Sequence, residues 1–290
     1  MRILEYKITD EHDGKRACDF LRRNENFSYA LIVKLRHSPD SLKLDGEFIR
    51  TVDRLKAGSV LTVEIPETSG GDEPNFELDI PKLYEDDDII VFDKPAGVPV
   101  HPSKGHQTDT LANYCAAHYP CSKFHAIGRL DMDTSGLVLV AKNSHAAAVL
   151  TDAEMEKEYI AVAEGEPVAM LGTINVPIDD TNPEAHRRFV AAGGRAAVTD
   201  YEVFAKGENL FAALVRPKTG RTHQIRVHFS FMGNPLAGDE LYGGSRALIS
   251  RHALHRSSLA FAHPVTGEPL SFSSKPPEDM QRLIDRMEIL

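Results

Sequence analysis

Cysteine is scarce in this chain, which has 290 residues and only three cysteines, Cys18, Cys115 and Cys121. An odd number leaves at least one thiol unpaired, and so small a set does not build the disulfide framework of a small secreted domain. We therefore expect a protein of a reducing compartment.

Long apolar runs are missing too. No window approaches the roughly 18 consecutive apolar residues of a membrane span, and residues 1–6 have neither a signal-peptide core nor an Arg-rich transit pattern. Internal repeats and low-complexity tracts are also absent. With 42% hydrophobic and 26% charged residues, we expect a globular protein of the cytoplasm, without a membrane partner, that has one large core and a smaller satellite domain.

Positive charge is in deficit, since the formal net charge is -10. The excess is local: residues 64–91 hold ten acidic residues against one lysine, Lys82. Residues 181–228 instead hold eight basic residues against four acidic ones. A basic surface that binds a polyanion is therefore compatible with the acidic total.

The first 66 residues read as a separate unit. Apolar patterning predicts helices over residues 16–23 and 29–37, and strands near residues 42–44 and 60–63 with turn residues between them. This order resembles the alpha-L RNA-binding motif, in which two helices present basic side chains to structured RNA. The resemblance implies that residues 1–66 form a small α/β RNA-binding domain; a packing domain without RNA contacts is the alternative.

Residues 67–80 are polar, acidic and rich in glycine, which predicts a flexible linker. From residue 81 to 290, strand-like and helix-like runs are interspersed without strict alternation. We expect strands at residues 89–92, 137–141, 157–163, 197–205, 211–216 and 225–229, and helices at residues 111–118 and 144–155. This order predicts an α+β domain with a mixed, mainly antiparallel central sheet.

One polar motif stands directly before an apolar strand. It reads Gly128-Arg129-Leu130-Asp131-Met132-Asp133-Thr134-Ser135-Gly136 and runs into the apolar residues 137–141. A turn with no chemical role does not need an arginine and two aspartates at the mouth of a buried strand. We interpret Asp131 as a catalytic carboxylate.

A second motif lies downstream, Thr219-Gly220-Arg221-Thr222-His223-Gln224-Ile225-Arg226-Val227-His228. Together with the Asp131 motif, Asp93-Lys94-Pro95-Ala96-Gly97 and Lys157-Glu158-Tyr159, it resembles the RluA-type pseudouridine synthases, which isomerise uridine in folded RNA. The resemblance covers roughly residues 81–272 and implies the pseudouridine synthase fold for the catalytic domain.

The resemblance also implies roles for single residues. Asp131 would be the nucleophile or base, Arg221 the cation beside it, and Tyr159 a ring against the target base that can also act as a general base. Arg129 would fill the gap left by the flipped base, and Ile225 would form an apolar wall of the pocket. From their basic segment, Arg187 and Arg188 are expected to contact RNA phosphates, whereas His223 and His228 are expected to be structural.

The isomerisation breaks the C–N glycosidic bond and joins C5 of the base to the same sugar carbon, without net redox change. No cofactor and no metal are expected, because a carboxylate and a base-holding pocket suffice. The expected partner is structured RNA, ribosomal RNA first and transfer RNA as the alternative, with no obligate protein partner.

Two hypotheses from other classes remain. Asp131-Met132-Asp133-Thr134 fits the start of Mg²⁺-dependent phosphatases that use an Asp-x-Asp pair, although that motif should follow an apolar strand. Cys115, His118, Cys121 and His125 have spacings close to those of a structural zinc site, which would make the chain a zinc-stabilised RNA-binding module.

Overall fold

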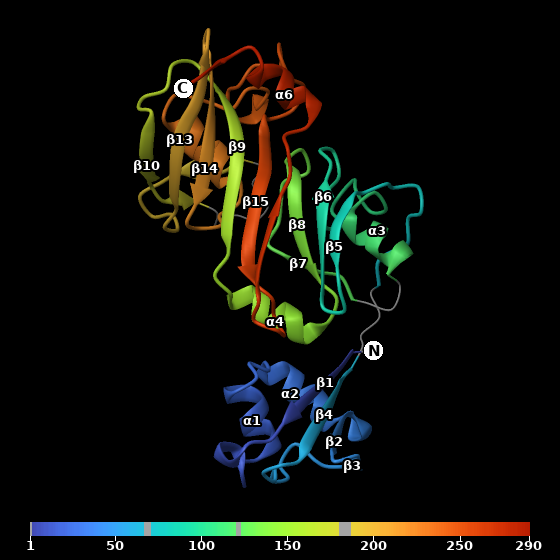
Figure 1. The fold of residues 1–290 in the computed structure, drawn as a ribbon. Coiled ribbons are helices and arrows are strands. Elements are labelled where there is room, and N and C mark those ends of the chain that lie inside the picture. The colour runs from blue at the N-terminus through green and yellow to red at the C-terminus, as the bar shows by residue number, and fades with distance from the viewer. Residues whose placement is uncertain (1, 67–70, 120–122, 180–186) are drawn as a thin grey trace.

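The computed structural model describes residues 2–66, 71–119, 123–179 and 187–290. They form a small amino-terminal body and a larger body built around one broad sheet (Figure 1). None of the helices within these ranges is long and apolar enough to cross a membrane.

The amino-terminal body packs two helices against a four-stranded antiparallel sheet of order β1-β4-β2-β3. It has its own core, which runs from Leu4 to Ile65. The predicted helices are confirmed to within one residue at each end. The elements are β1 (Arg2–Lys7), η1 (Asp10–His12), α1 (Ala17–Arg23), α2 (Tyr29–Arg36), η2 (Pro39–Ser41), β2 (Leu42–Leu44), β3 (Glu47–Phe48) and β4 (Val60–Ile65).

The larger body is an eleven-stranded mixed sheet in which the order along the main path is β10-β13-β14-β9-β15-β8-β6-β5. Only the contact between β8 and β15 is parallel among the described strand pairs, so the expected mixed, mainly antiparallel sheet is confirmed. Its strands are β5 (Lys82–Glu85), β6 (Ile89–Lys94), β7 (His125–Ile127), β8 (Ser135–Ala141), β9 (Glu156–Glu164), β10 (Leu171–Asn175), β13 (Val198–Gly207), β14 (Leu210–Pro217), β15 (Leu254–Ala262), β16 (Pro269–Ser273) and β17 (Glu288–Ile289).

The helices of this body are α3 (Leu111–His118), α4 (Ser144–Asp152), α5 (Gln224–Phe231), η3 (Glu240–Tyr242) and α6 (Glu278–Ile284), and a small separate hairpin pairs β11 (Ile178–Asp179) with β12 (Phe189–Val190). The predicted helix at residues 111–118 is confirmed, and α4 ends three residues earlier than expected.

One prediction is wrong: residues 225–229, expected as a strand, belong to the helix α5. Apolar residues alternate there with Arg226 and His228, which imitates the period of a half-buried strand. The segment is instead buried throughout, because His228 binds the Thr199 hydroxyl at 2.9 Å and Arg226 is paired with carboxylates. Polar residues satisfied inside a core hide the helical period.

The segment before β5 lies against α3. The backbone nitrogen of Asn75 donates to the carbonyl of Asn113 at 3.1 Å, Asn113 Nδ2 donates to the carbonyl of Glu73 at 2.7 Å, and Ile80 is buried. This packing differs from the flexible linker expected for residues 67–80, of which residues 67–70 lie outside the described ranges.

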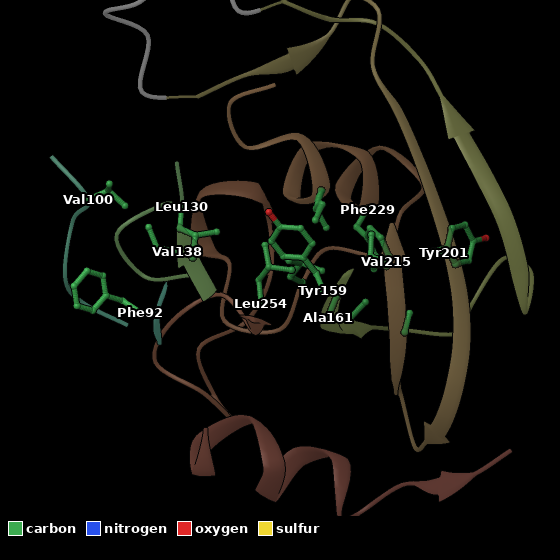
Figure 2. Packing of buried hydrophobic residues seen from close by; sticks show 14 of the residues in the cluster. Phe92, Val100, Leu130, Val138, Tyr159, Ala161, Tyr201, Val215, Phe229 and Leu254 are labelled. Carbon is green, nitrogen blue, oxygen red and sulfur yellow. The ribbon is translucent and has the colours of Figure 1, made fainter. Parts of the chain in front are cut away.

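The core of the larger body positions the candidate site. Figure 2 shows Tyr159 of β9 and Leu254 of β15 at its centre, with Phe229 of α5 on one side and Phe92 and Val138 on the other. Burying side chains of this size stabilises the fold by about 1.5–3 kcal/mol each. The helix α5 is therefore fixed against the sheet close to the loop that carries Leu130.

The two bodies meet at α4, which lies between them in Figure 1. The rings of Phe27 and His145, at the start of α4, are 4.4 Å apart. Arg2 donates from Nε and Nη2 to the carboxylate of Asp88 at 2.9 and 2.8 Å. Arg2 also pairs with Asp87 at 3.4 Å, and Val265 packs against the core of the amino-terminal body. Apolar contacts and ion pairs therefore join the two bodies.

Candidate active site

The Asp131 motif forms the loop between β7 and β8. The backbone nitrogen of Thr134 donates to the carbonyl of Asp131 at 3.1 Å and closes a tight turn. At the start of β8, Gly136 has φ +107°, and a Cβ atom there would lie 2.2 Å from the carbonyl oxygen of Arg256. Only glycine therefore allows β8 to approach β15 directly after the loop.

A buried lysine, Lys94, also supports the loop that carries Asp131. Lys94 is 0% exposed, and its Nζ atom donates to the carbonyl oxygens of Pro95, Val98 and Met132 at 2.8, 2.8 and 2.9 Å. Burial lowers the pKa of Lys94 to about 7. The Asp93-Lys94-Pro95-Ala96-Gly97 motif thus holds the residue that follows Asp131.

The carboxylate of Asp131 faces Arg226, which α5 contributes. Arg226 Nη1 lies 2.9 Å from Asp131 Oδ2, while Nε and Nη2 bind the two oxygens of Asp239 at 2.7 and 2.8 Å. The guanidinium also lies 5.1 Å from the ring centroid of Tyr242. A planar cation fixed by a second carboxylate therefore presents one nitrogen to Asp131.

The electrostatics keep Asp131 ionised. Burial acts to raise its pKa, but the positive charges of His223 and Arg226 outweigh burial and hold the pKa of Asp131 below its usual value. Burial also lowers the pKa of His223 itself, so Arg226 is the partner that stays charged at neutral pH. About a quarter of the Asp131 side chain, 27%, remains exposed to the cavity.

His223 lines the site rather than the core. It is the N-cap residue of α5 and has a left-handed backbone conformation with φ +58°. Its Nε2 atom lies 3.7 Å from Asp131 Oδ2. Its Nδ1 atom lies 3.0 Å from the hydroxyl of Tyr242. His223, which was expected to be structural, therefore also faces Asp131 in the cavity. His228 is buried and hydrogen-bonded as expected.

Tyr159 stands on β9 directly opposite Arg256 of β15. Its hydroxyl accepts from Arg256 Nε at 2.9 Å and from Nη2 at 2.6 Å. The side chain of Arg256 is buried beside the ring, 5.1 Å from its centroid.

A cavity of about 310 Å³ joins these groups. Its volume is at the lower end of small-ligand pockets, which measure roughly 300–1,000 Å³. The residues that line it are Gly128, Arg129, Leu130, Asp131, Thr134, Lys157, Tyr159, Pro217, Thr219, Gly220, Arg221, Thr222, His223, Gln224, Ile225, Arg226, Leu254 and Arg256. Five residues predicted from the sequence thus meet in one cavity: Asp131, Tyr159, Arg129, Arg221 and Ile225.

The placement of Arg221 corrects one expectation. Its Nε atom donates to the carbonyl of Ala196 at 3.0 Å, and the cation beside Asp131 is Arg226. The reason is the helix α5: the chain turns after Arg221, whose backbone nitrogen donates to Gln224 Oε1 at 3.0 Å, and the helix then directs Arg226 toward the carboxylate.

Arg187 and Arg188 lie outside the cavity lining. Arg187 is exposed, and its guanidinium lies 5.6 Å from the ring centroid of Tyr242. Arg188 is buried, and its backbone nitrogen donates to the Tyr242 hydroxyl at 2.8 Å. The two residues thus approach the site through Tyr242.

The metal hypotheses receive no support from the described geometry. The carboxylate of Asp131 is paired with Arg226, which leaves it a poor Mg²⁺ ligand. Cys115 packs in the hydrophobic core, where burial raises the pKa of its thiol to about 12, and Cys121 lies outside the described residues. Within the described ranges, the side chains that could together hold a metal ion are Asp86, Asp88 and His263, and none of them belongs to either predicted metal motif.

Four residues of the site were given no role from the sequence: Arg226, Asp239, Tyr242 and Arg256. Arg226 could have been recognised as a site residue because it lies in the same motif as Arg221. The strand expected at residues 225–229 would, however, have given its side chain a direction different from the one it has on the helix α5. Arg256 carried none, since its role follows from the register between β9 and β15.

Comparison with known proteins shows what this chain is similar to. The RNA pseudouridylate synthase family matches residues 88–231. The chain is 37% identical over 269 residues to an uncharacterized RNA pseudouridine synthase, YjbO, of Bacillus subtilis, covering 89% of this chain and 94% of that one. It is 36% identical over 284 residues to ribosomal large subunit pseudouridine synthase D of Xanthomonas campestris, with coverages of 90% and 85%.

Among solved structures, human RNA pseudouridylate synthase domain containing 1 is 26% identical and superposes with a TM-score of 0.61, over 75% of this chain and 91% of that one. The catalytic body therefore has the pseudouridine synthase fold. Because the bacterial similarity runs through nearly the whole length of both chains, this chain belongs to the RNA pseudouridine synthase family, of the type that includes the large-subunit synthases D.

Proposed function

We propose that this RNA pseudouridine synthase isomerises specific uridines of ribosomal RNA and that Asp131 is its catalytic carboxylate. The observation that carries the proposal is the ionised Asp131, held 2.9 Å from Arg226 at the wall of a base-sized cavity. A carboxylate in this state can attack C1′ of the ribose, attack the base, or remove the C2′ proton.

The other cavity residues fit the remaining needs of the reaction. The target uridine must leave its stack to reach Asp131. The ring of Tyr159 offers a stacking face to the uracil, and Ile225 offers an apolar wall. Arg129 is exposed at the rim of the cavity, where a planar cation can occupy the space that the flipped base leaves.

The choice of ribosomal RNA rests on the relatives named ribosomal large subunit pseudouridine synthase D, in Xanthomonas campestris and Pseudomonas aeruginosa. The amino-terminal body suits a large structured RNA. Its helices α1 and α2 expose four basic side chains, Arg22, Arg23, Lys34 and Arg36, which can contact phosphates. We assign RNA binding to residues 1–66 on this ground.

The test is pseudouridine mapping by carbodiimide labelling and primer extension in total RNA. Cells that lack the gene are compared with cells rescued by the wild type, by Asp131→Asn, and by Asp152→Asn, a matched change at an exposed position. We expect one or more ribosomal sites to disappear on deletion and to return with the wild type and D152N only. Loss of a transfer RNA site instead would show that the substrate is transfer RNA. Restoration of the site by D131N would show that Asp131 is not the catalytic carboxylate.

A further inference from the structure

Among the described residues, four arginines of the larger body are buried: Arg188, Arg226, Arg251 and Arg256. Two of them are paired with carboxylates through two nitrogens each: Arg226 with Asp239, and Arg251 with Asp279, at 2.7 and 2.9 Å. This pairing is the ordinary state of a buried cation, because an uncompensated charge inside a protein is strongly disfavoured.

Arg256 departs from that pattern. It is 3% exposed, two of its nitrogens donate to the hydroxyl of Tyr159, and Nη1 donates to the carbonyl of Leu137 at 3.0 Å. Within residues 2–66, 71–119, 123–179 and 187–290, no carboxylate forms an ion pair with it. Its hydrogen bonds are satisfied, but its charge is not neutralised.

A second basic side chain, Lys157, lies near Arg256. Lys157 also lines the cavity, and burial, followed by the charge of Arg256, lowers the pKa of Lys157. This wall of the cavity therefore carries two cationic side chains around Tyr159, a setting that favours an anion.

The hydrogen bonds from Arg256 also restrict what Tyr159 can do. A tyrosine hydroxyl has two acceptor positions and one proton. Because both acceptor positions receive N–H groups of one guanidinium, the proton is what the hydroxyl can offer to the cavity. Donation from a cation also strengthens the next bond in such a chain.

The isomerisation generates an anion of the required kind. When the C1′–N1 bond breaks, its electron pair leaves with the uracil, which then carries negative charge over N1 and its carbonyl oxygens. Resting on the proposed function, we propose that Arg256 is a positioning residue that holds Tyr159 as a hydrogen-bond donor to the departing uracil and stabilises the negative charge on that base.

The bonds and protons balance without a further reactant. C1′ loses N1, and Asp131 acts in one of two ways. Its carboxylate bonds to C1′, and this C1′–O bond breaks, returning its electron pair to Asp131, when C5 attacks C1′. Alternatively Asp131 removes the C2′ proton, which leaves a C1′=C2′ double bond, and returns that proton to C2′ as the C1′–C5 bond forms. The base turns, the C5 electron pair forms the C1′–C5 bond, C5 releases its hydrogen as a proton, and N1 takes up a proton. Tyr159 and Arg256 act at the first of these steps.

The test compares Arg256→Met, Arg256→Lys and Tyr159→Phe with the wild type. The control is Arg282→Met, the same change at a side chain that is 66% exposed. The substrate is an unmodified transcript of large-subunit ribosomal RNA carrying tritium at C5 of uridine, and tritium release is followed in single turnover. We expect R256M to be slower by roughly 100-fold, R256K to recover part of the rate, and RNA affinity and R282M to stay at wild-type level.

Two further measurements separate this role from structural support. In a double-mutant cycle, R256M combined with Y159F should be little slower than either single variant, because both remove one unit. With 5-fluorouridine RNA, whose electron-poor base carries negative charge more easily, the slowing of base cleavage by R256M should be at least about threefold smaller than with uridine RNA. Cleavage is followed by nuclease digestion and mass spectrometry.

Full activity of R256M, or equal slowing with both RNAs, would overturn the inference while the proposed function stands. If R256M does not fold, R256K and Y159F are tested in its place by tritium release and by cleavage of 5-fluorouridine RNA, with the same outcomes for the inference. A wild type that releases no tritium from the transcript would instead reject ribosomal RNA as the substrate.

Discussion

Asp131 and Asp239 share one guanidinium: Arg226 binds Asp131 Oδ2 through Nη1 at 2.9 Å and both oxygens of Asp239 through Nε and Nη2. Asp239 is almost completely buried, with 1% of its side chain exposed, whereas the Asp131 carboxylate reaches the cavity. Asp239 therefore fixes the cation, and the cation fixes the charge state of Asp131.

Replacing Arg226 by lysine should be far more harmful than the same change at Arg221. A single ammonium group cannot reproduce the three hydrogen bonds that Arg226 makes to two carboxylates. We expect R226K to slow single-turnover pseudouridine formation by at least about 100-fold and R221K by about tenfold or less. Equal losses in the two variants would contradict the pairing described here.

The activity should not fall between pH 8 and pH 5 through protonation of Asp131. The pKa of this carboxyl is held below its ordinary value, which is about 3.9, so the reactive ionised form is lost only when the pH falls through that lower value. Single-turnover rates across this range measure it. An acid limb centred near pH 6 that moves in R226K would show that Asp131 is not held as inferred.

Alanine at Gly136 should disrupt both the fold and the site. The added Cβ would meet the backbone of Arg256 at 2.2 Å, which forces β8 and β15 apart, so we expect a loss of more than about 3 kcal/mol in the free energy of unfolding. Gly267 is the matched control, since it also has positive φ, +72°, but open space around it. Alanine there should cost about 1–2 kcal/mol; urea unfolding of both variants checks the difference.

Acid should weaken the joint between the two bodies through His145. Burial lowers its pKa to about 4, whereas the unfolded chain has a value near 6.5. Between these values the unfolded state binds more protons, so stability falls as the pH drops, by on the order of 1.4 kcal/mol per pH unit at most. His145→Gln should flatten this dependence in unfolding measured from pH 6.5 to 4.5, and an unchanged slope would exclude His145 as its source.

Much of the architecture was predictable because its signals are local. The helix at residues 111–118 is preceded by Thr110, which forms a capping box with Asn113. The apolar runs at residues 137–141 and 157–163 became the strands β8 and β9 of the central sheet, one on each side of β15. Asp131, Tyr159, Arg129 and Ile225 came together in one cavity because they lie in recognisable motifs.

The missed features depend on tertiary contacts. Residues 224–229 of the helix α5 are all buried, and the polar residues Arg226 and His228 find partners on other elements, so the alternation of polar and apolar residues there does not mark a buried and an exposed face. Arg256 faces Tyr159 only because β15 returns to β9 in one register. No local pattern within residues 254–262 announces that neighbour.

The strand β8 pairs with β15, which follows it by more than 100 residues, through His255 with Ser135 and Arg256 with Gly136. This order matters when the protein is synthesised in the cell. A nascent chain that has emerged only as far as Arg226 already contains Asp131 and the guanidinium that faces it. It still lacks the strand that seats Tyr159 and closes the sheet beside the loop. We therefore expect the growing polypeptide to lack a complete site until β15 has left the ribosome.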